Sequence, residues 1–253
     1  MPSISLTTLP GLPLVKKGDS LTALILRAAE GHGVRFGAGD VVVVAQKIVS
    51  KAEGRLVPLA SVTPGAEARA LAAETDKDPR LAQLILDECA TVLRKKPGVI
   101  IVRHRLGHVG ANAGIDQSNV EHEGGEHALL LPRDPDASAA RLQAELSAAA
   151  GCHLAVIICD SMNRPWRLGT VGGAIGCAGL EVLDDRRGQH DMFGRELKVT
   201  MINRADSIAA MATLLMGESI ERTPVAVVQG FAVDARHGRA ADIIRPAADD
   251  LFN

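Results

Sequence analysis

Aromatic residues are scarce in this chain of 253 residues, where they make up only 2%. Hydrophobic residues nevertheless account for 47% and charged residues for 23%, which is ordinary for a soluble globular protein. The core must therefore be built from Val, Ile, Leu and Ala. A chain of this length forms one large domain or two small ones, with a sizeable core.

The chain also lacks a strong net charge, a long apolar run and a leader-like N-terminus. Its formal net charge of −2 gives no bulk attraction to nucleic acid or to a membrane surface. No run approaches the roughly 18 apolar residues that a membrane helix needs, and residues 1–15 have no basic region followed by an apolar stretch. We therefore expect a cytoplasmic protein with neither nucleic acid nor membrane as a partner.

The four cysteines include no C-x-x-C pair, and three of them lie in or beside apolar segments; they are Cys89, Cys152, Cys159 and Cys177. This pattern favours reduced core thiols over disulfides or a metal site. Two familiar phosphate-binding loops are also missing, because no G-x-G-x-x-G follows the first expected strand and G-x-x-x-x-G-K-[ST] occurs nowhere. A nucleotide site in this chain must be built differently.

Hydrophobic periodicity predicts helices and strands that mix along the chain, without an internal repeat or a low-complexity linker. Apolar residues at helical spacing, with typical start and stop residues, predict helices over 20–33, 79–96, 134–151 and 205–218. Runs of β-branched and apolar residues predict strands over 40–50, 98–105, 152–160 and 224–231. The strands are too few and too irregularly separated to require a Rossmann order.

A carboxylate and a hydroxyl, Asp160 and Ser161, stand at the end of the apolar strand expected at 152–160. Polar residues at strand ends occupy favoured functional positions. Carboxylate and hydroxyl oxygens suit Mg²⁺ or Mn²⁺. An N-cap for a following helix explains the same pair equally well.

Two further segments offer oxygen ligands. Small residues surround Asp116 in GANAGIDQSNV, which lets the backbone approach a ligand; the simpler alternative is a turn in which Asp116 and Asn119 bond their own backbone. Glu218 follows a predicted helix whose dipole opposes an acid there by roughly 0.3–1 kcal/mol. A metal could offset that cost, and a Gly217 C-cap with a solvated Glu218 beyond it is the alternative.

Basic residues accompany these segments. Arg164 and Arg167 could hold phosphate or carboxylate, or could be surface charges stacked on Trp166. Lys47 and Lys51 follow a buried strand and could neutralise phosphate oxygens, although each is also typical of a surface lysine. Together with three oxygen-bearing segments they suit metal-assisted phosphate chemistry, without naming a reaction.

Two histidines among acids, His122 and His127, match no common zinc spacing, and Gly124 and Gly125 between them favour a solvated loop.

Several long motifs occur along the chain: QKIVSKAEGR, NAGIDQSNV, LLPRDPDASAARL, DSMNRPWRLGTVGGAIG and ADSIAAMATLLMGE. With these motifs the chain resembles the coenzyme F420-0:L-glutamate ligases, also called gamma-glutamyl ligases. The resemblance extends from about residue 10 to the C-terminus.

The resemblance implies a reaction. In this family GTP phosphorylates the terminal carboxylate of the deazaflavin precursor F420-0, and the amino group of L-glutamate then displaces phosphate to form an amide. A further glutamate can follow through a gamma-linkage. Phosphorylation supplies the leaving group that a carboxylate lacks. Two divalent ions, Mg²⁺ or Mn²⁺, neutralise charge during the transfer, and K⁺ is a further candidate cofactor.

The resemblance also assigns residues by their position in the motifs. Asp116 and Asp160 would hold one metal, and Ser161 and Glu218 the second. Arg164 and Arg167 would receive an anionic substrate. The implied nucleotide contacts are Leu12, Pro13, Leu14, Val15, Gln46, Lys47, Lys51, Asn119, Met216, Gly217, Glu218, Ser219, Ile220, Glu221, Arg222 and Thr223.

For the fold, the resemblance implies α+β subunits with mixed sheets and packed helices, in which residues 1–253 form a single unit of two subdomains. Two such subunits would form an intertwined homodimer with the site at its interface. Some bacterial relatives carry a second, flavin-binding domain. Because the sequence stops at Asn253, we do not expect that domain.

Three departures from the family pattern concern specificity. Asn163 stands where many relatives have Gly, and Asn tolerates a left-handed conformation. The loop over 218–224 is less Gly-rich and carries Arg222, which leaves the base preference open. Gln229 stands where Arg is common.

Three alternatives therefore stay open: an amide ligase for a different acid, a metal-dependent phosphohydrolase, and a non-catalytic nucleotide- or deazaflavin-binding protein.

Overall fold

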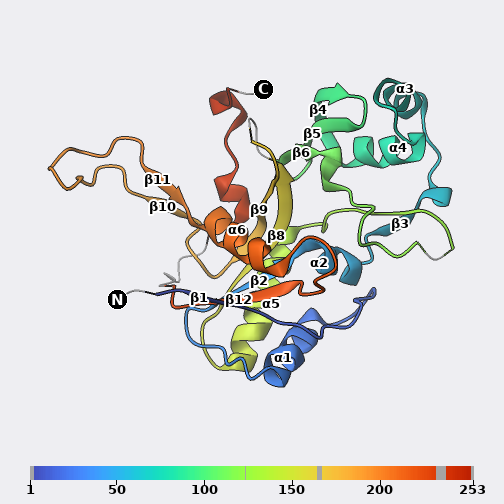
Figure 1. Ribbon diagram of the computed structural model, residues 1–253. Helices are drawn as coiled ribbons and strands as arrows, with labels where there is room; N and C mark the ends of the chain where they lie inside the picture. The colour runs from blue at the N-terminus through green and yellow to red at the C-terminus, as the bar shows by residue number, and fades with distance from the viewer. Residues whose placement is uncertain (1–2, 123, 164–166, 232–237, 252–253) are drawn as a thin grey trace.

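A five-stranded mixed sheet forms the centre of the computed structural model, which describes residues 3–122, 124–163, 167–231 and 238–251 (Figure 1). Within this sheet β2 and β8 run parallel, and the other neighbours are antiparallel. In spatial order its strands are β1 (Ser5–Thr8), β12 (Val225–Gln229), β2 (Val41–Ala45), β8 (Ala155–Asn163) and β9 (Thr170–Ala178). The mixed α+β class expected from the sequence is confirmed.

Helices cover both faces of this sheet. α1 (Leu21–Gly31), α2 (Gln46–Ala52) and α5 (Pro135–Ala150) share one core with strand residues such as Val42 and Val156. α6 (Arg204–Met216) packs on the other face, where Val43 and Ile157 point. Successive side chains of a strand point to opposite faces, so a strand covered on both faces must be apolar throughout. This explains the unbroken valine run of β2.

A second apolar core lies beside the central sheet, in the part of the chain at the upper right of Figure 1. There α3 (Ala66–Thr75) and α4 (Pro79–Glu88) lie near the three-stranded sheet of β4 (Cys89–Lys96), β5 (Val99–His104) and β6 (Val109–Ala111). β3 (Leu56–Pro58) pairs with β7 (His127–Leu129). Short 3-10 turns lie at Leu59–Ser61, Asn112–Gly114, Ala240–Ile243 and Ala247–Asp249.

An arm extends away from this body (Figure 1). Its base is the antiparallel pair β10 (Leu183–Asp185) and β11 (Met201–Asn203). Beyond the base, Met192, Phe193 and Val199 are 89%, 86% and 86% exposed. Large apolar side chains that stay in water on a protruding arm are typical of an interaction surface.

Three helices and two strands follow the sequence prediction closely. The predictions over 20–33, 134–151, 205–218 and 98–105 match α1, α5, α6 and β5. Local signals explain the agreement for α5, because Asp134 accepts a hydrogen bond from Ala137 N at its start and Gly151 adopts a left-handed conformation at its end. The strand over 224–231 is confirmed as β12, which lies inside the sheet between β1 and β2.

Three predicted elements were wrong at one end. The helix over 79–96 stops at Glu88, and residues from Cys89 onward form the edge strand β4, which pairs with β5 through two register shifts. The strand over 40–50 stops at Ala45, where α2 begins. The strand over 152–160 continues to Asn163, because residues opposite it in β9 pair with Asp160 and Ser161. The pair is therefore part of a strand, and the N-cap alternative is wrong.

Cysteine chemistry follows the sequence prediction. All four thiols are free, with Cys159 and Cys177 buried and the other two partly buried. Among the described residues, the structure contains no helix with both the length and the hydrophobicity to cross a membrane.

Candidate active site

The first half of the site joins α2 to the segment around Asp116. Gln46 is buried at the start of α2, and its Nε2 donates to Asp116 Oδ2 at 2.8 Å. Ser50 Oγ, one turn further along, donates to Gln46 Oε1 at 2.9 Å and so fixes the orientation of the amide. Lys47 Nζ lies 3.3 Å from Asp116 Oδ1. The carboxylate of Asp116 is thus held toward α2 rather than toward its own turn.

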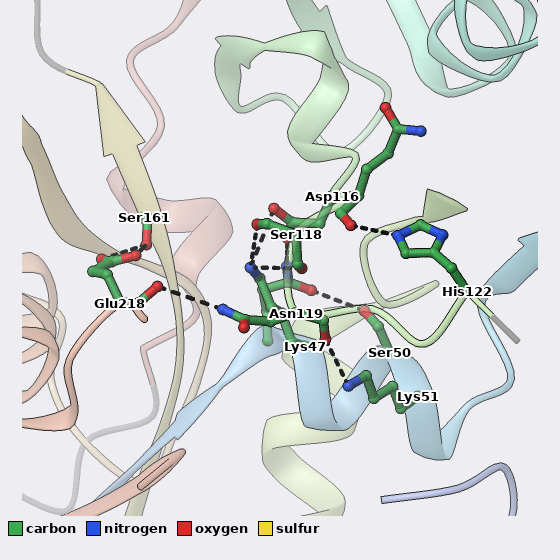
Figure 2. Close-up of polar contacts among 11 residues, drawn as sticks. Lys47, Ser50, Lys51, Asp116, Ser118, Asn119, His122, Ser161 and Glu218 are labelled. Atoms are coloured by element: carbon green, nitrogen blue, oxygen red, sulfur yellow. Dashed lines mark hydrogen bonds and ion pairs between the residues drawn. The ribbon is translucent and has the colours of Figure 1, made fainter. Parts of the chain in front are cut away.

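Two lysines on one face of α2 line the same side of the site (Figure 2). Lys47 Nζ lies 3.4 Å from both the carbonyl oxygen and the Oγ of Ser118, and Lys51 Nζ donates to the carbonyl oxygen of Asn119 at 3.0 Å. Burial and the neighbouring charge of Lys47 lower the pKa of Lys51. Two close cations that are partly withdrawn from water favour an anionic ligand beside them.

The second half of the site joins β8 to the loop after α6. Ser161 Oγ donates to both carboxylate oxygens of Glu218, at 2.5 and 2.6 Å. Asn119 Nδ2 lies 3.4 Å from the carbonyl oxygen of Glu218 and so links the two halves, as Figure 2 shows. Gly217 supports this arrangement because its φ of +76° is one that glycine adopts without strain. Asn119 and Glu218 are both exposed and Gly217 caps α6, as the C-cap alternative expects, and Glu218 is in addition bonded to Ser161 and Asn119.

Three acids influence one another electrostatically across the site. Burial and the nearby charge of Asp116 raise the pKa of Asp160 to about 7. Burial also raises the pKa of Asp116, and Glu218 contributes to that shift. Asp160 lies on β8, the strand that pairs with β2, and its side chain bonds Gln46 at the start of α2. Glu218 follows α6, the helix that packs on the other face of the sheet. A divalent cation is the kind of group that would favour their ionised forms.

The donor set fits a hard divalent cation, because it consists of carboxylate and hydroxyl oxygens. Among the described residues, no three His, Cys, Asp or Glu side chains form a ready cluster for one ion. Mg²⁺ commonly takes one or two carboxylates and completes its shell with phosphate oxygens and water. The pairing of Asp116 with Asp160, and of Ser161 with Glu218, is compatible with that mode of binding.

The remaining residues that were assigned to the nucleotide divide into two groups. Leu12 and Val15 are buried in the core that also contains α2, whereas Pro13 and Leu14 are exposed and available to a ligand. In the loop after α6, Thr223 Oγ1 donates to the carbonyl oxygen of Met216 at 2.8 Å, which closes the loop on itself. Within the same loop Ser219 N donates to a carboxylate oxygen of Glu221 at 2.8 Å, Ile220 is 87% exposed, and Arg222 has a φ of +56°.

The predicted anion-binding arginines are not joined to this site by the described contacts. Arg167 is exposed. Arg164 and Trp166 lie outside the described residues. The two histidines of the 121–127 loop belong to that loop, because His122 bonds the Gln117 carbonyl oxygen at 2.9 Å and accepts from His127 N at 3.1 Å.

Two glycines of β9 help to position the side chains of the site. The sequence analysis did not predict this role. Gly172 and Gly173 pair with Ser161 and Asp160. A Cβ on Gly172 would lie 2.5 Å from the carbonyl oxygen of Ala209 in α6. The absence of a side chain lets α6 pack directly on β9, which places Glu218 at the end of α6 beside Ser161. The signal was the GTVGGAIG stretch, which has little strand character by itself.

Comparison with known proteins identifies the family. A model described as F420-0:Gamma-glutamyl ligase matches residues 11–230. The chain belongs to this family. A protein from Methanothermobacter thermautotrophicus named coenzyme F420:L-glutamate ligase is 42% identical over 251 residues, covering 98% of both chains. Proteins of the same name from Methanopyrus kandleri and Methanocaldococcus jannaschii are 40% and 39% identical; they align with 100% and 95% of this chain and over 98% and 94% of their own lengths.

Two of the departures from the usual gamma-glutamyl ligase pattern have structural roles. Asn163 lies in extended backbone at the end of β8, paired with Thr170, so its tolerance of a left-handed conformation is not used. Gln229 Nε2 donates to Asp40 Oδ2 at 2.7 Å and to the Arg35 carbonyl oxygen at 3.2 Å. Gln229 therefore fastens the end of β12 to the segment before β2.

Proposed function

We propose that this protein is a GTP-dependent ligase that adds L-glutamate to F420-0 through an acyl phosphate, first as an amide and then through gamma-linkages. The observation that carries the proposal is the convergence of Asp116, Asp160, Ser161 and Glu218 next to two partly buried lysines. The names of the relatives, coenzyme F420:L-glutamate ligase, support the same substrate.

Two divalent ions, Mg²⁺ or Mn²⁺, are part of the proposal, with K⁺ as a further candidate. Asp116 and Asp160 would hold one ion, and Ser161 and Glu218 the other. Bound there, the ions would neutralise charge on the triphosphate. Lys47 and Lys51 would add fixed positive charge for the same oxygens. Because Asp116 and Asp160 are partly buried, their attraction for a cation is stronger than it would be in water.

The bond changes balance without another reactant. An oxygen of the acceptor carboxylate attacks the γ-phosphorus of GTP, and the bond to the β-phosphate oxygen breaks to release GDP. The nitrogen of L-glutamate then attacks the acyl carbon, and inorganic phosphate leaves with the former carboxylate oxygen. The amine proton passes to water. The residues of this chain hold the phosphates, with the nucleotide along Pro13 and Leu14, α2, Asn119 and the 216–223 loop.

The expected experiment is mass spectrometry of F420-0 after incubation with the protein, GTP, a divalent metal and L-glutamate. Successive mass gains of glutamyl units are expected, and they should disappear when GTP or glutamate is left out. Replacing GTP with ATP measures the base preference. Product from other acids but not from F420-0 would indicate a different amide ligase. Phosphate release that needs no acceptor acid would indicate a phosphohydrolase. Binding of GTP or F420-0 without turnover would indicate a non-catalytic binding protein.

We also propose that two copies of the chain form the intertwined homodimer of two-subdomain subunits that the family resemblance implies. The exposed apolar side chains of the arm support this, because a second subunit would withdraw Met192 and Phe193 from water. The double change Met192→Asp and Phe193→Asp is expected to convert a dimer into a monomer in light scattering. Leu251→Asp, at a position 91% exposed but outside the arm, is the matched control. An unchanged dimer in the double variant would exclude this role.

A further inference from the structure

A cavity of about 550 Å³ lies at the start of α5 and is not used by the residues discussed so far. Its lining is mainly apolar, with Leu106, Pro135, Ala140 and Ile175 among the contributors. Its size falls within the roughly 300–1,000 Å³ of small-molecule sites. The cavity is therefore large enough for a ring system of a cofactor-like molecule.

A smaller cavity of about 70 Å³ lies at the candidate active site. Asp160, Ser161 and Gly110 of β6 contribute to its lining. His108 and Ile175 line both cavities, so the two cavities are neighbours. The smaller, narrow cavity has room for a chain-like group but not for a ring.

The charged side chains that line the large cavity are two arginines and two aspartates. Arg133 and Arg239 contribute to its lining. Two acids also line it, but their oxygens already accept backbone N–H groups: Asp134 from Ala137, and Asp136 from Cys177, Ala240 and Ala241. Arg239 is paired with Asp242 at 3.0 Å but is 68% exposed, so its guanidinium still faces water. An anionic ligand would meet two guanidinium groups there.

We propose that the two cavities together form the binding site of the acceptor acid. The large cavity takes a planar, largely apolar ring, Arg133 and Arg239 face an anionic linker, and the narrow cavity leads the terminal carboxylate to Asp160 and Ser161. This inference rests on the proposed ligase function, which it deepens by assigning a place to the acid. Selectivity for the acid then lies in α5 and β6, whereas the nucleotide contacts lie on α2, which packs on the same face of the sheet as α5.

The first test is a substitution that fills the large cavity from an exposed position, so that the hydrophobic core is not disturbed. Ala140 is exposed on α5 and lines the cavity, so Ala140→Trp places a bulky ring inside it. Ala148→Trp, at an exposed position two turns further along the same helix and outside the cavity, is the matched control. We expect Ala140→Trp to raise the KM for F420-0 by roughly tenfold or more, since each lost 1.4 kcal/mol of binding corresponds to tenfold. The KM values for GTP and glutamate should not change.

A second variant addresses the narrow cavity. A Cβ at Gly110 would meet no atom within 4 Å, so Gly110→Leu is expected to fold and to narrow this cavity. We expect it to lower kcat/KM for F420-0 while GTP binding, measured by calorimetry, stays at the wild-type value. Both variants are also tested by equilibrium dialysis against F420-0 without GTP, which measures binding independently of turnover.

The outcomes separate this inference from the proposed function. If the wild type ligates glutamate and both variants keep its KM for F420-0, the cavities are not the acid site while the function stands. If the wild type binds F420-0 in dialysis but does not ligate it, the proposed ligase function is wrong. Weaker F420-0 binding by Ala140→Trp would then still support the cavities as the binding site of the acid. A change of oligomeric state in Ala140→Trp with unchanged F420-0 binding would make the cavity a subunit contact and overturn the proposal.

Discussion

Replacing Asp160 with alanine is expected to abolish GTP-dependent addition of glutamate while the protein still folds. The charge of Asp116 contributes to the raised pKa of Asp160, and the two carboxylates are proposed to share a metal ion. Loss of such a ligand removes several kcal/mol of charge stabilisation, which corresponds to a rate loss on the order of 10³-fold or more. The measurement is the initial rate of glutamyl-product formation at saturating GTP, with circular dichroism to confirm the fold.

Asp160→Asn sharpens this test because it keeps the size of the side chain and removes only the charge. It is expected to lose nearly as much activity as the alanine variant and to bind Mn²⁺ more weakly in calorimetry. Asp185→Asn, on the exposed base of the arm, should behave like the wild type. Turnover at the wild-type rate by either Asp160 variant would refute the assignment of this residue.

Replacing Glu88 with glutamine is expected to produce the largest loss of stability of the changes considered. Glu88 is buried at the end of α4 and accepts from three basic groups: Arg55 Nη2 at 2.8 Å, Arg105 Nε at 3.0 Å, and His104 Nε2, which lies 3.2 Å away. Arg55 Nε also donates to the Leu131 carbonyl oxygen at 2.8 Å. The cluster thus ties the second core to the segment that leads into α5.

Burial opposes the ionisation of Glu88, but the hydrogen bonds from His104, Arg55 and Arg105 outweigh it and lower its pKa from 4.5 to about 2. That difference corresponds to about 3 kcal/mol of stability. Because the folded-state pKa lies below the unfolded one, this contribution is complete above pH 4.5 and is lost as the pH falls toward 2. Glu88→Gln also leaves the buried Arg55 without its counter-charge.

The measurement is the free energy of unfolding from urea titrations of the wild type and Glu88→Gln across this pH range. We expect a difference of about 3 kcal/mol near neutral pH that shrinks as the pH falls from 4.5 toward 2. Glu74→Gln is the matched control, because the ion pair of Glu74 with Lys95 is about half exposed and contributes at most about 1 kcal/mol. A pH-independent difference would show that packing rather than charge stabilises this cluster.

Local signals in the sequence were sufficient for several elements and for the family. The helix over 134–151 carries its own cap residues, and the valine run before Gln46 has the unbroken hydrophobicity of a strand buried on both faces. The motifs around Asp116 and Asp160 indicated the family, which the comparison then established. These features depend only on residues that are close together in the sequence, so they can be recognised in a single sequence.

What the tertiary structure decided depends on contacts between distant parts of the chain. The extension of β8 through Asp160 and Ser161 requires the glycine-rich β9 to pair with it, and the position of Glu218 requires α6 to pack on Gly172. The junctions at Ala45 and Glu88 were missed for the same reason, since pairing and packing override local propensity there. The sequence by itself determined the family. The packing of β8, β9 and α6 decided that Ser161 meets Glu218, because those partners are far apart along the chain and only the folded sheet brings them together.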